Sequence, residues 1–200
     1  MWKQYVSALM VGALIAIFKL PLMLAVVLLM FISLWIMGEF LYVVYRSTNM
    51  KKVEKFIISK KKEPIYQYVY TQGFGSLEEQ ILALDKIIQK YKQPHIHYYY
   101  SALRELLSDN FAEAWSAAEK IGKEPFMSYT KAVINVKTGN IQSAKSYKFD
   151  KEWMAVAIMA MIAAENKDKE AFELHSTDAI DAARGVQRLS LIYSFKAMDI

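Results

Sequence analysis

Side chains that could carry out metal or acid–base chemistry are few in this sequence and lie far apart. The chain of 200 residues has no cysteine and three histidines, His95, His97 and His175. Thiolate zinc sites and cysteine nucleophiles are therefore excluded. His95 and His97 stand two positions apart in a predicted helix, where they point to different faces. We expect them to pack in the fold rather than bind a metal.

Other patterns of reactive residues also lack the context that catalysis needs. Tyr147 and Lys151 have the spacing of a Tyr-x-x-x-Lys catalytic pair, but no nucleotide-binding fold accompanies them. Glu113, Glu119 and Glu124 fit the solvated face and end of one amphipathic helix. The chain has no Walker A motif, dinucleotide-binding glycine pattern, HExxH motif or nucleophile elbow. The sequence predicts a non-enzymatic protein with no cofactor, no metal and no small-molecule substrate.

The elements that carry these residues begin with a long apolar segment. Hydrophobic residues make up 54% of the chain, and between residues 5 and 45 the only charges are Lys19 and Glu39. At about 1.5 Å per residue, one helix of this length would be about twice as long as the ~30 Å hydrocarbon core of a bilayer. Pro21 follows Lys19 closely and favours the start of a second helix there. We predict a transmembrane helical hairpin in residues 1–46.

The two predicted spans cover residues 2–18 and 21–45, and the charges that follow set their orientation. Seven basic residues and one acidic residue lie between positions 46 and 62. The basic residues, which we expect at the membrane surface, are Arg46, Lys51, Lys52, Lys55, Lys60, Lys61 and Lys62. The positive-inside rule places this segment, and with it both termini, in the cytoplasm of a cell-membrane protein. Residues 47–62 form the predicted basic juxtamembrane helix, which would attract anionic lipid headgroups.

Three alternatives concern the apolar segment. A cleaved signal peptide would also begin with Lys3 and an apolar run, but no small-x-small cleavage site precedes the second run. A buried hairpin of a soluble protein would need a polar face, which these residues lack. Glu39 is interpreted as an interfacial residue, with an intramembrane carboxylate for ion handling as the alternative. The basic segment could also be a plain solvated helix face.

The remaining chain is close to neutral and is patterned as helices. From residue 63 onward there are 16 basic and 18 acidic residues, so the excess of positive charge belongs to the segment before it and predicts no nucleic-acid partner. Residues 65–70 alternate as a strand would, but no partner strand is evident, and Pro64 suits the first position of a helix. We therefore predict an all-α chain.

An internal repeat organises this helical part. Residues 49–64 and 110–125 have equal length, begin with Asn, end in Lys-Glu-Pro and share their apolar positions. Each proline is followed by another predicted helix, and further turn-then-helix starts lie at 139–145 and 166–172. The equivalent positions Gln80, Ala114, Ala144 and Ala171 are 34, 30 and 27 residues apart. An irregular helical bundle with chance periodicity is the alternative.

This pattern resembles the tetratricopeptide repeat, a family built from antiparallel helix pairs with a period near 34. Residues 109–114 (Asp-Asn-Phe-Ala-Glu-Ala) stand where the family has its turn and the small residue of its second helix. Ala102 and Ala132 occupy the small first-helix position, and Tyr98 stands where the family prefers an aromatic residue. The family's Leu-Gly pair is missing from every unit. The resemblance implies an α-solenoid over residues 63–176, with residues 177–200 as a C-terminal capping helix.

The resemblance also implies a function, because such repeats bind peptides or helices on the concave side formed by their first helices. The matching positions form a predicted partner-binding groove of Ile65, Tyr66, Val69, Tyr99, Tyr100, Leu103, Tyr129, Thr130 and Val133. Packing between hairpins is the alternative role of these side chains. An apolar groove suits an amphipathic helix or a hydrophobic segment of a protein partner.

We therefore expect a non-catalytic, membrane-anchored scaffold or adaptor with a cytoplasmic repeat domain. One alternative is a transmembrane accessory subunit or regulator of a transporter or membrane enzyme complex. Small residues of the first span, such as Ala8, Gly12 and Ala16, would allow the close helix packing that this alternative needs. A membrane protein of haem biosynthesis, which shares the order of two spans before repeats, is a third possibility.

Overall fold

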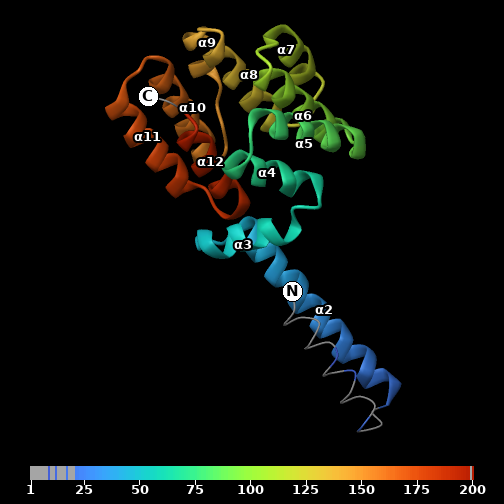
Figure 1. Cartoon of the computed structure of the whole chain (residues 1–200). Coiled ribbons are helices and arrows are strands. Elements are labelled where there is room, and N and C mark those ends of the chain that lie inside the picture. The colour runs from blue at the N-terminus through green and yellow to red at the C-terminus, as the bar shows by residue number, and fades with distance from the viewer. Residues whose placement is uncertain (1–8, 10–11, 13–16, 18–20, 199) are drawn as a thin grey trace.

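The computed structural model describes residues 9, 12, 17, 21–198 and 200, and the prediction of an all-α chain is confirmed for this part. The described residues form eleven helices and no strand (Figure 1). The helices are α2 (Leu22–Tyr45), α3 (Met50–Lys60), α4 (Pro64–Phe74), α5 (Leu77–Lys90), α6 (Pro94–Leu107), α7 (Phe111–Glu119), α8 (Phe126–Lys137), α9 (Ile141–Ser146), α10 (Glu152–Glu165), α11 (Lys169–Ala182) and α12 (Gly185–Lys196).

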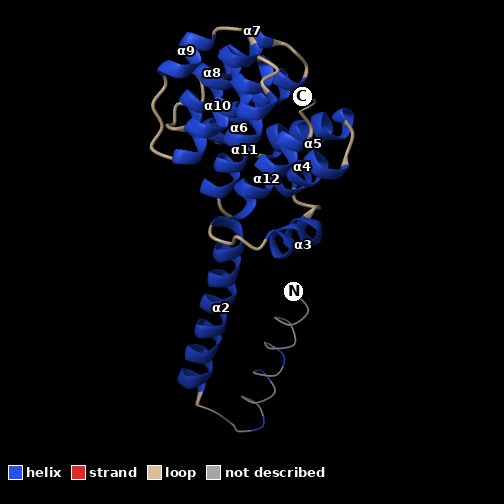
Figure 2. Ribbon diagram, turned by 90° about the vertical axis from the view of Figure 1, so that its left-hand side faces the viewer, coloured by secondary structure: helices blue, strands red, loops and turns tan. Residues whose placement is uncertain are grey.

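Helix α2 projects from the other helices as a separate stalk (Figure 2). It has 24 residues, which at about 1.5 Å each gives roughly 36 Å. The segment Met23–Tyr45 is long and apolar enough to cross a membrane, and only 6% of its most apolar window is buried. The second predicted span is therefore confirmed as an exposed apolar helix. The first predicted span, residues 2–18, lies outside the described residues except for Leu9, Gly12 and Ile17.

The segment with strand-like alternation is helical, as predicted. Helix α4 begins at Pro64, whose fixed φ and missing N–H suit the first position of a helix. The next helix, α5, begins with a capping box, in which Ser76 and Glu79 each accept a hydrogen bond from the other's backbone N–H. Local sequence signals therefore determine where both helices of this pair begin.

One type of corner joins α6 to α7, α8 to α9 and α10 to α11. In each corner a residue with positive φ follows the helix: Asp109, Gly139 and Lys167, at φ 56°, 76° and 56°. The next residue then donates its backbone N–H to a carbonyl five positions earlier, as Asn110 does to Glu105 at 2.9 Å. The same bond joins Asn140 to Asn135 and Asp168 to Ala163. This is the Schellman arrangement, so the three corners repeat in structure as well as in sequence.

Small residues mark the close contacts between the helices, as the repeat predicts. Ala102, Ala114 and Ala132 are completely buried, and Ala144 is 1% exposed. Ala114 packs with Ala102 and Ala118 between α6 and α7. Gln80 and Ala171, the outer two positions of the register, are only partly buried. Burial is therefore complete or nearly so at the two central positions of the predicted register, Ala114 and Ala144, and partial at the outer two.

The helices pack mainly in chain order, with α8 also contacting α6 and α10. Helix α12 differs, because it packs on α11 and also returns to α2, α3 and α4 (Figure 1). The prediction of one capping helix in residues 177–200 is therefore wrong. The segment is divided at Arg184, where α11 has ended and α12 begins, because Gly185 has a φ of +58°. Helix α12, the second half of this segment, therefore connects α11 with α2, α3 and α4.

Gly185 fixes the contact between α12 and the end of α2. Its backbone N–H donates to the carbonyl of Ser47 at 2.8 Å. A Cβ atom at this position would lie 2.0 Å from the carbonyl oxygen of Val44, closer than any real contact. Only glycine fits both the backbone conformation and the space. The apolar stalk is therefore held directly by the C-terminal helix.

Candidate functional site

The central cavity, of about 270 Å³, opens among helices α4, α5, α6, α8, α10 and α12. Its apolar wall consists of Leu103, Leu106, Leu107, Val133, Met161, Ala197 and Met198. Its polar residues are Tyr68, Gln72, Gln80, Lys137, Tyr193 and Ser194. Ligand pockets usually measure ~300–1,000 Å³, so this cavity suits one or two side chains of a partner rather than a whole metabolite.

A polar network between α4 and α12 forms one end of the central cavity. Gln72 donates through Nε2 to the hydroxyl oxygens of Tyr68, at 3.3 Å, and of Ser194, at 3.4 Å. It accepts a hydrogen bond from the Ser190 hydroxyl through Oε1 at 2.8 Å. The Tyr193 hydroxyl is buried without a hydrogen-bond partner among the described residues, and burial raises its pKa to about 12. These groups stay neutral near pH 7, so they can orient a ligand but not exchange protons with it.

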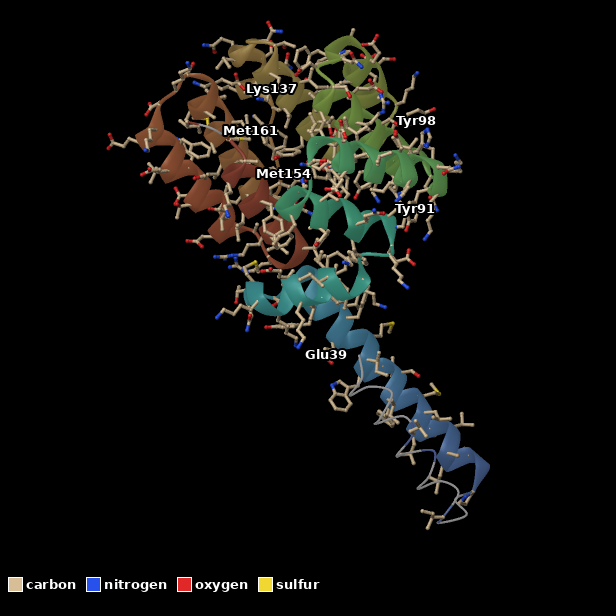
Figure 3. The ribbon with its side chains drawn as sticks, in the orientation of Figure 1. Glu39, Tyr91, Tyr98, Lys137, Met154 and Met161 are labelled. Carbon is tan, nitrogen blue, oxygen red and sulfur yellow. The ribbon has the colours of Figure 1, made fainter. Side chains whose placement is uncertain are left out.

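The other end of the cavity carries a charged pair. Lys137 of α8 forms an ion pair with Glu165 of α10, and Met161 lies one turn before Glu165. Figure 3 labels Lys137 and Met161 on these neighbouring helices. Exposed ion pairs of this kind contribute little stability, about 0–1 kcal/mol. The cavity therefore has an apolar middle between two polar ends, a pattern that suits an amphipathic segment.

The nine residues of the predicted groove do not lie together around one cavity. Leu103 and Val133 line the central cavity, but the other seven predicted residues do not. Val69, Tyr129 and Thr130 are buried, at 6%, 9% and 1% exposure, so a partner cannot reach them, and the prediction is wrong for these three. On α4, α6 and α8 the cavity lies about one helical turn closer to the C-terminal end than predicted.

Aromatic packing explains this shift. Rings from the first helices contact one another in pairs: Tyr68 with Tyr100 at 6.1 Å, Tyr99 with Phe126 at 5.7 Å, and Tyr129 with Trp153 at 5.3 Å between centroids. These pairs connect α4 to α6, α6 to α8 and α8 to α10 in turn. Tyr66 instead packs on Phe56 of α3, and Ile65 joins the cluster around Leu84. The aromatic residues predicted for the groove therefore hold the helices together.

The hydroxyls of these tyrosines share a dry environment. Burial raises the pKa of Tyr99 to about 12 and also raises the pKa values of Tyr68, Tyr100 and Tyr129. Desolvation disfavours the charged tyrosinate, so the hydroxyls remain protonated. Together with their ring contacts, this indicates a structural role.

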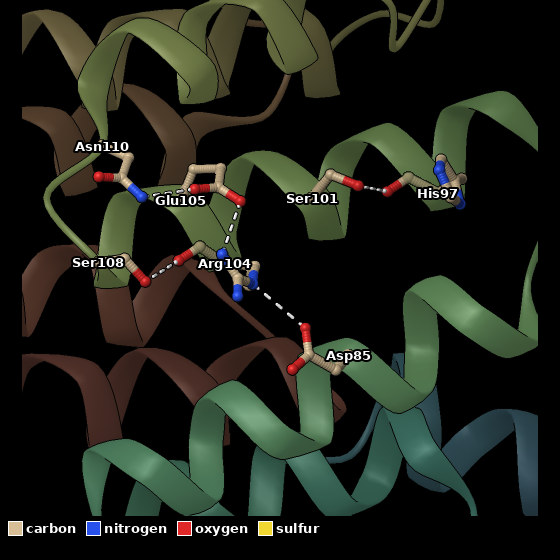
Figure 4. A network of polar contacts seen from close by, with 7 residues as sticks. All are labelled: Asp85, His97, Ser101, Arg104, Glu105, Ser108 and Asn110. Atoms are coloured by element: carbon tan, nitrogen blue, oxygen red, sulfur yellow. Dashed lines mark hydrogen bonds and ion pairs between the residues drawn. The ribbon is translucent and has the colours of Figure 1, made fainter.

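His97, one of the three histidines, contacts the neighbouring helix, and a charged network lies further along α6. His97 places Nδ1 3.1 Å from the carbonyl oxygen of Ile88, on the neighbouring helix. Arg104 pairs with Asp85 of α5 at 3.2 Å and with Glu105 at 2.9 Å, and Asn110 donates to Glu105 at 2.8 Å (Figure 4). This network ties α5 to α6 and to the following corner.

The two residues of the Tyr-x-x-x-Lys pattern contact different aromatic rings. Tyr147 stacks on Phe149 with 6.5 Å between ring centroids, whereas Lys151 lies 6.0 Å from the ring centroid of Phe126. Among the described residues, no group of three or more His, Asp or Glu side chains is placed to hold a metal ion.

The predicted basic residues fall into separate places. Lys52, Lys55 and Lys60 line a second cavity between α2 and α3. Lys61 and Lys62 instead line a hollow beside α4 and α5, where the Lys61 ammonium is 5.0 Å from the Tyr70 ring centroid. Arg46 ends α2 and Lys51 is exposed on α3. The predicted single basic surface is therefore divided by the position of α3.

Sequence reasoning missed the contribution of α12 to the central cavity. Gln72 and Ser190 are 118 residues apart in sequence, and no local pattern pairs them. Gly73 is the one local signal, because a Cβ atom there would lie 2.7 Å from the ring of Tyr193. A glycine inside the apolar pattern of α4 indicates that another element approaches closely.

No protein-family model matches the chain, and no curated protein or solved structure is significantly similar to it.

Proposed function

We propose that this protein is a non-catalytic membrane-anchored scaffold, in which a tetratricopeptide-like helical domain binds a protein partner at the central cavity. One observation carries the proposal: the exposed apolar helix α2 is joined through Ser47 and Gly185 to the helix, α12, that lines this cavity. The three equal corners and the buried Ala102, Ala114 and Ala132 support the repeat-like architecture.

The shape of the cavity favours an apolar anchor of a partner helix. Leu103, Leu107 and Met161 offer a dry surface for one or two large side chains. Gln72 and Lys137 at the two ends can hydrogen-bond to polar groups that flank such an anchor. The same cavity lacks a nucleophile with an adjacent base, so binding is the function that it supports best.

Site-specific photo-crosslinking tests where the partner binds. A photoreactive phenylalanine analogue replaces Leu107 in the central cavity, Leu174 on the exposed face of α11, or Trp35 on α2. We expect a discrete protein adduct from position 107 only, and we expect Val133→Lys to remove it by blocking the cavity. Adducts from position 35 alone would support the alternative of a transmembrane accessory subunit, and adducts from none of the three would contradict the scaffold.

Reporter fusions test the orientation. The basic segment after α2 predicts that the domain is cytoplasmic. A reporter after Ile200 and another inserted beside Lys19 should therefore report opposite sides of the membrane. An external C-terminal reporter would contradict a cytoplasmic scaffold.

A further inference from the structure

A second cavity, here called the α2–α3 cavity, measures about 280 Å³ and lies at the corner between these helices. Helix α2 contributes Ile36, Glu39 and Phe40, and helix α3 contributes Lys52, Lys55 and Lys60. One wall is therefore mainly apolar and the other is basic. Figure 3 shows Glu39 on α2 directly beside α3.

The basic wall results from the way α3 packs on the domain. Val53 and Ile57 are buried, at 0% and 1% exposure, and hold one face of α3 against the other helices. Lys52 and Lys55, three positions apart, are exposed on the side of α3 turned away from Val53 and Ile57, and Lys60 is the half-buried last residue of the helix. Packing of the core face therefore turns the lysines towards the stalk.

The charges of the cavity leave a surplus of positive charge. Lys52 pairs with Glu39 at 3.2 Å. Among the described residues, Lys55 and Lys60 form no ion pair, although the charge of Lys60 adds to that of Lys90 in lowering the pKa of the exposed Glu63. Their ammonium groups are therefore the ones in the cavity that can bind an anion. The Ser59 hydroxyl donates to the carbonyl of Phe56 at 2.7 Å and is already engaged.

The corner that forms the cavity is fixed on both sides. Phe56 contacts the ring of Phe40 at 5.6 Å between centroids and the ring of Tyr66 at 5.2 Å, which joins α2, α3 and α4. Asn49 caps α3 by accepting from the Lys52 N–H at 3.1 Å, and its own N–H donates to the Ser47 hydroxyl at 3.2 Å. The cavity therefore exists before any ligand binds, which lowers the entropic cost of binding.

The position of the cavity along α2 identifies its occupant. At ~1.5 Å per residue, Glu39 lies about 26 Å from Leu22, close to the ~30 Å thickness of the hydrocarbon core. We propose that the α2–α3 cavity binds an anionic phospholipid, with Lys55 and Lys60 on its phosphate and its upper acyl chain against Ile36 and Phe40. This inference rests on the proposed membrane anchoring by α2. A free phosphate would leave the apolar wall unused, whereas a phospholipid uses both walls.

Native mass spectrometry of the full chain in detergent micelles tests the site, with dioleoylphosphatidylglycerol and dioleoylphosphatidylcholine as probes. We expect phosphatidylglycerol to bind preferentially, and the double variant Lys55→Glu/Lys60→Glu to weaken its binding at least tenfold. The matched control, Lys51→Glu/Lys62→Glu, makes the same change of charge in the same segment outside the cavity, and should weaken binding less than twofold. Equal losses in both variants, or no loss in the first, would overturn the proposal.

Two further measurements separate binding from folding and from anchoring. The milder pair Lys55→Gln/Lys60→Gln should also weaken phosphatidylglycerol binding while keeping the thermal midpoint of the wild type, and unchanged binding in this pair would overturn the site. Inorganic phosphate should not displace the lipid at equal concentration; displacement would mean that the cavity recognises free phosphate. Both variants should stay in the membrane fraction and keep the adduct at position 107, so loss of the lipid site is distinguishable from failure of the scaffold.

Discussion

Helices α2 and α10 are both strongly apolar but have opposite surroundings. Both are apolar around their whole circumference, and neither has a polar face. In α10, Met154 and Ala160 are completely buried by α8, α11 and the C-terminal helix. In α2, Met23 is 81% exposed and Trp35 is 70% exposed. Within the described part of the chain, α2 is left largely uncovered, and a bilayer is an environment that suits such an exposed apolar helix, as the proposed anchoring requires.

The two helices also differ in length. Helix α10 has 14 residues, about 21 Å, which is too short for a hydrocarbon core of ~30 Å. Helix α2, with 24 residues, is long enough. The apolar excess of this chain therefore has two sources, a helical core rich in alanine and methionine and an exposed apolar stalk. Substitutions can disrupt either one without the other.

A buried positive charge gives the largest expected effect. Ile158 of α10 is 2% exposed, so Ile158→Arg places an unpaired charge in the core and should destabilise the domain by more than about 4 kcal/mol. Leu29→Arg in the middle of α2 should leave the domain folded and weaken membrane insertion by about 3 kcal/mol. Thermal unfolding in detergent and carbonate extraction of membranes measure the two effects. If Leu29→Arg unfolded the domain and stayed fully membrane-bound, α2 would be a core helix.

The joint between the two regions gives the next effect. Gly185→Ala forces a Cβ atom against the Val44 carbonyl at a positive φ and should cost about 3 kcal/mol, because a clash is added to backbone strain. Gly139→Ala is the matched control, since it also has a positive φ but open space around it, and should cost about 1 kcal/mol. Chemical denaturation of the full chain in detergent compares them. Equal costs would mean that α12 does not depend on close contact with α2.

The parts of this fold that depend on neighbouring residues in sequence could be predicted. Pro64, the Ser76 capping box and the corner after Asp109 each act within a few residues, so the sequence indicates where these helices begin or end. Burial at Ala102 and Ala114 follows from the same periodicity. The path of α12 could not be predicted, because its contacts with Gln72 and Ser47 join segments more than 100 residues apart.

The site was predicted less well for a related reason. The sequence identifies which helices contain aromatic residues, but the direction of each ring depends on the angle between helices. Tyr99 and Tyr129 are therefore used in contacts with Phe126 and Trp153, and the cavity forms one turn further along. The lysines of α3 could be placed more directly from the sequence. Lys52 and Lys55 are three residues apart, so they share one face of the helix whatever its angle to its neighbours.

A third prediction concerns the core of the helical domain, where a larger side chain replaces Ala114. This residue is completely buried between α6 and α7, so Ala114→Leu should cost about 1–3 kcal/mol. Ala112→Leu, two positions earlier on the exposed face of α7, should change stability by less than about 0.5 kcal/mol. The thermal midpoints of both variants in detergent measure these costs. A midpoint for Ala114→Leu equal to that of Ala112→Leu would show that the contact between α6 and α7 accommodates a larger side chain without cost.

The smallest expected effect concerns Tyr99, one of the tyrosines whose hydroxyls are buried in the helical domain. Burial raises the pKa of Tyr99 to about 12, against about 10 in an unfolded chain. Because the folded state favours the neutral hydroxyl, its stabilising contribution is complete below pH 10 and is lost as the pH rises from 10 towards 12. Between pH 9 and pH 11, Tyr99→Phe should therefore lose about 1 kcal/mol less stability than the wild type. Denaturant titrations at the two pH values, with absorbance at 295 nm to follow tyrosinate, measure the difference, and parallel losses in both proteins would mean that water reaches the Tyr99 hydroxyl.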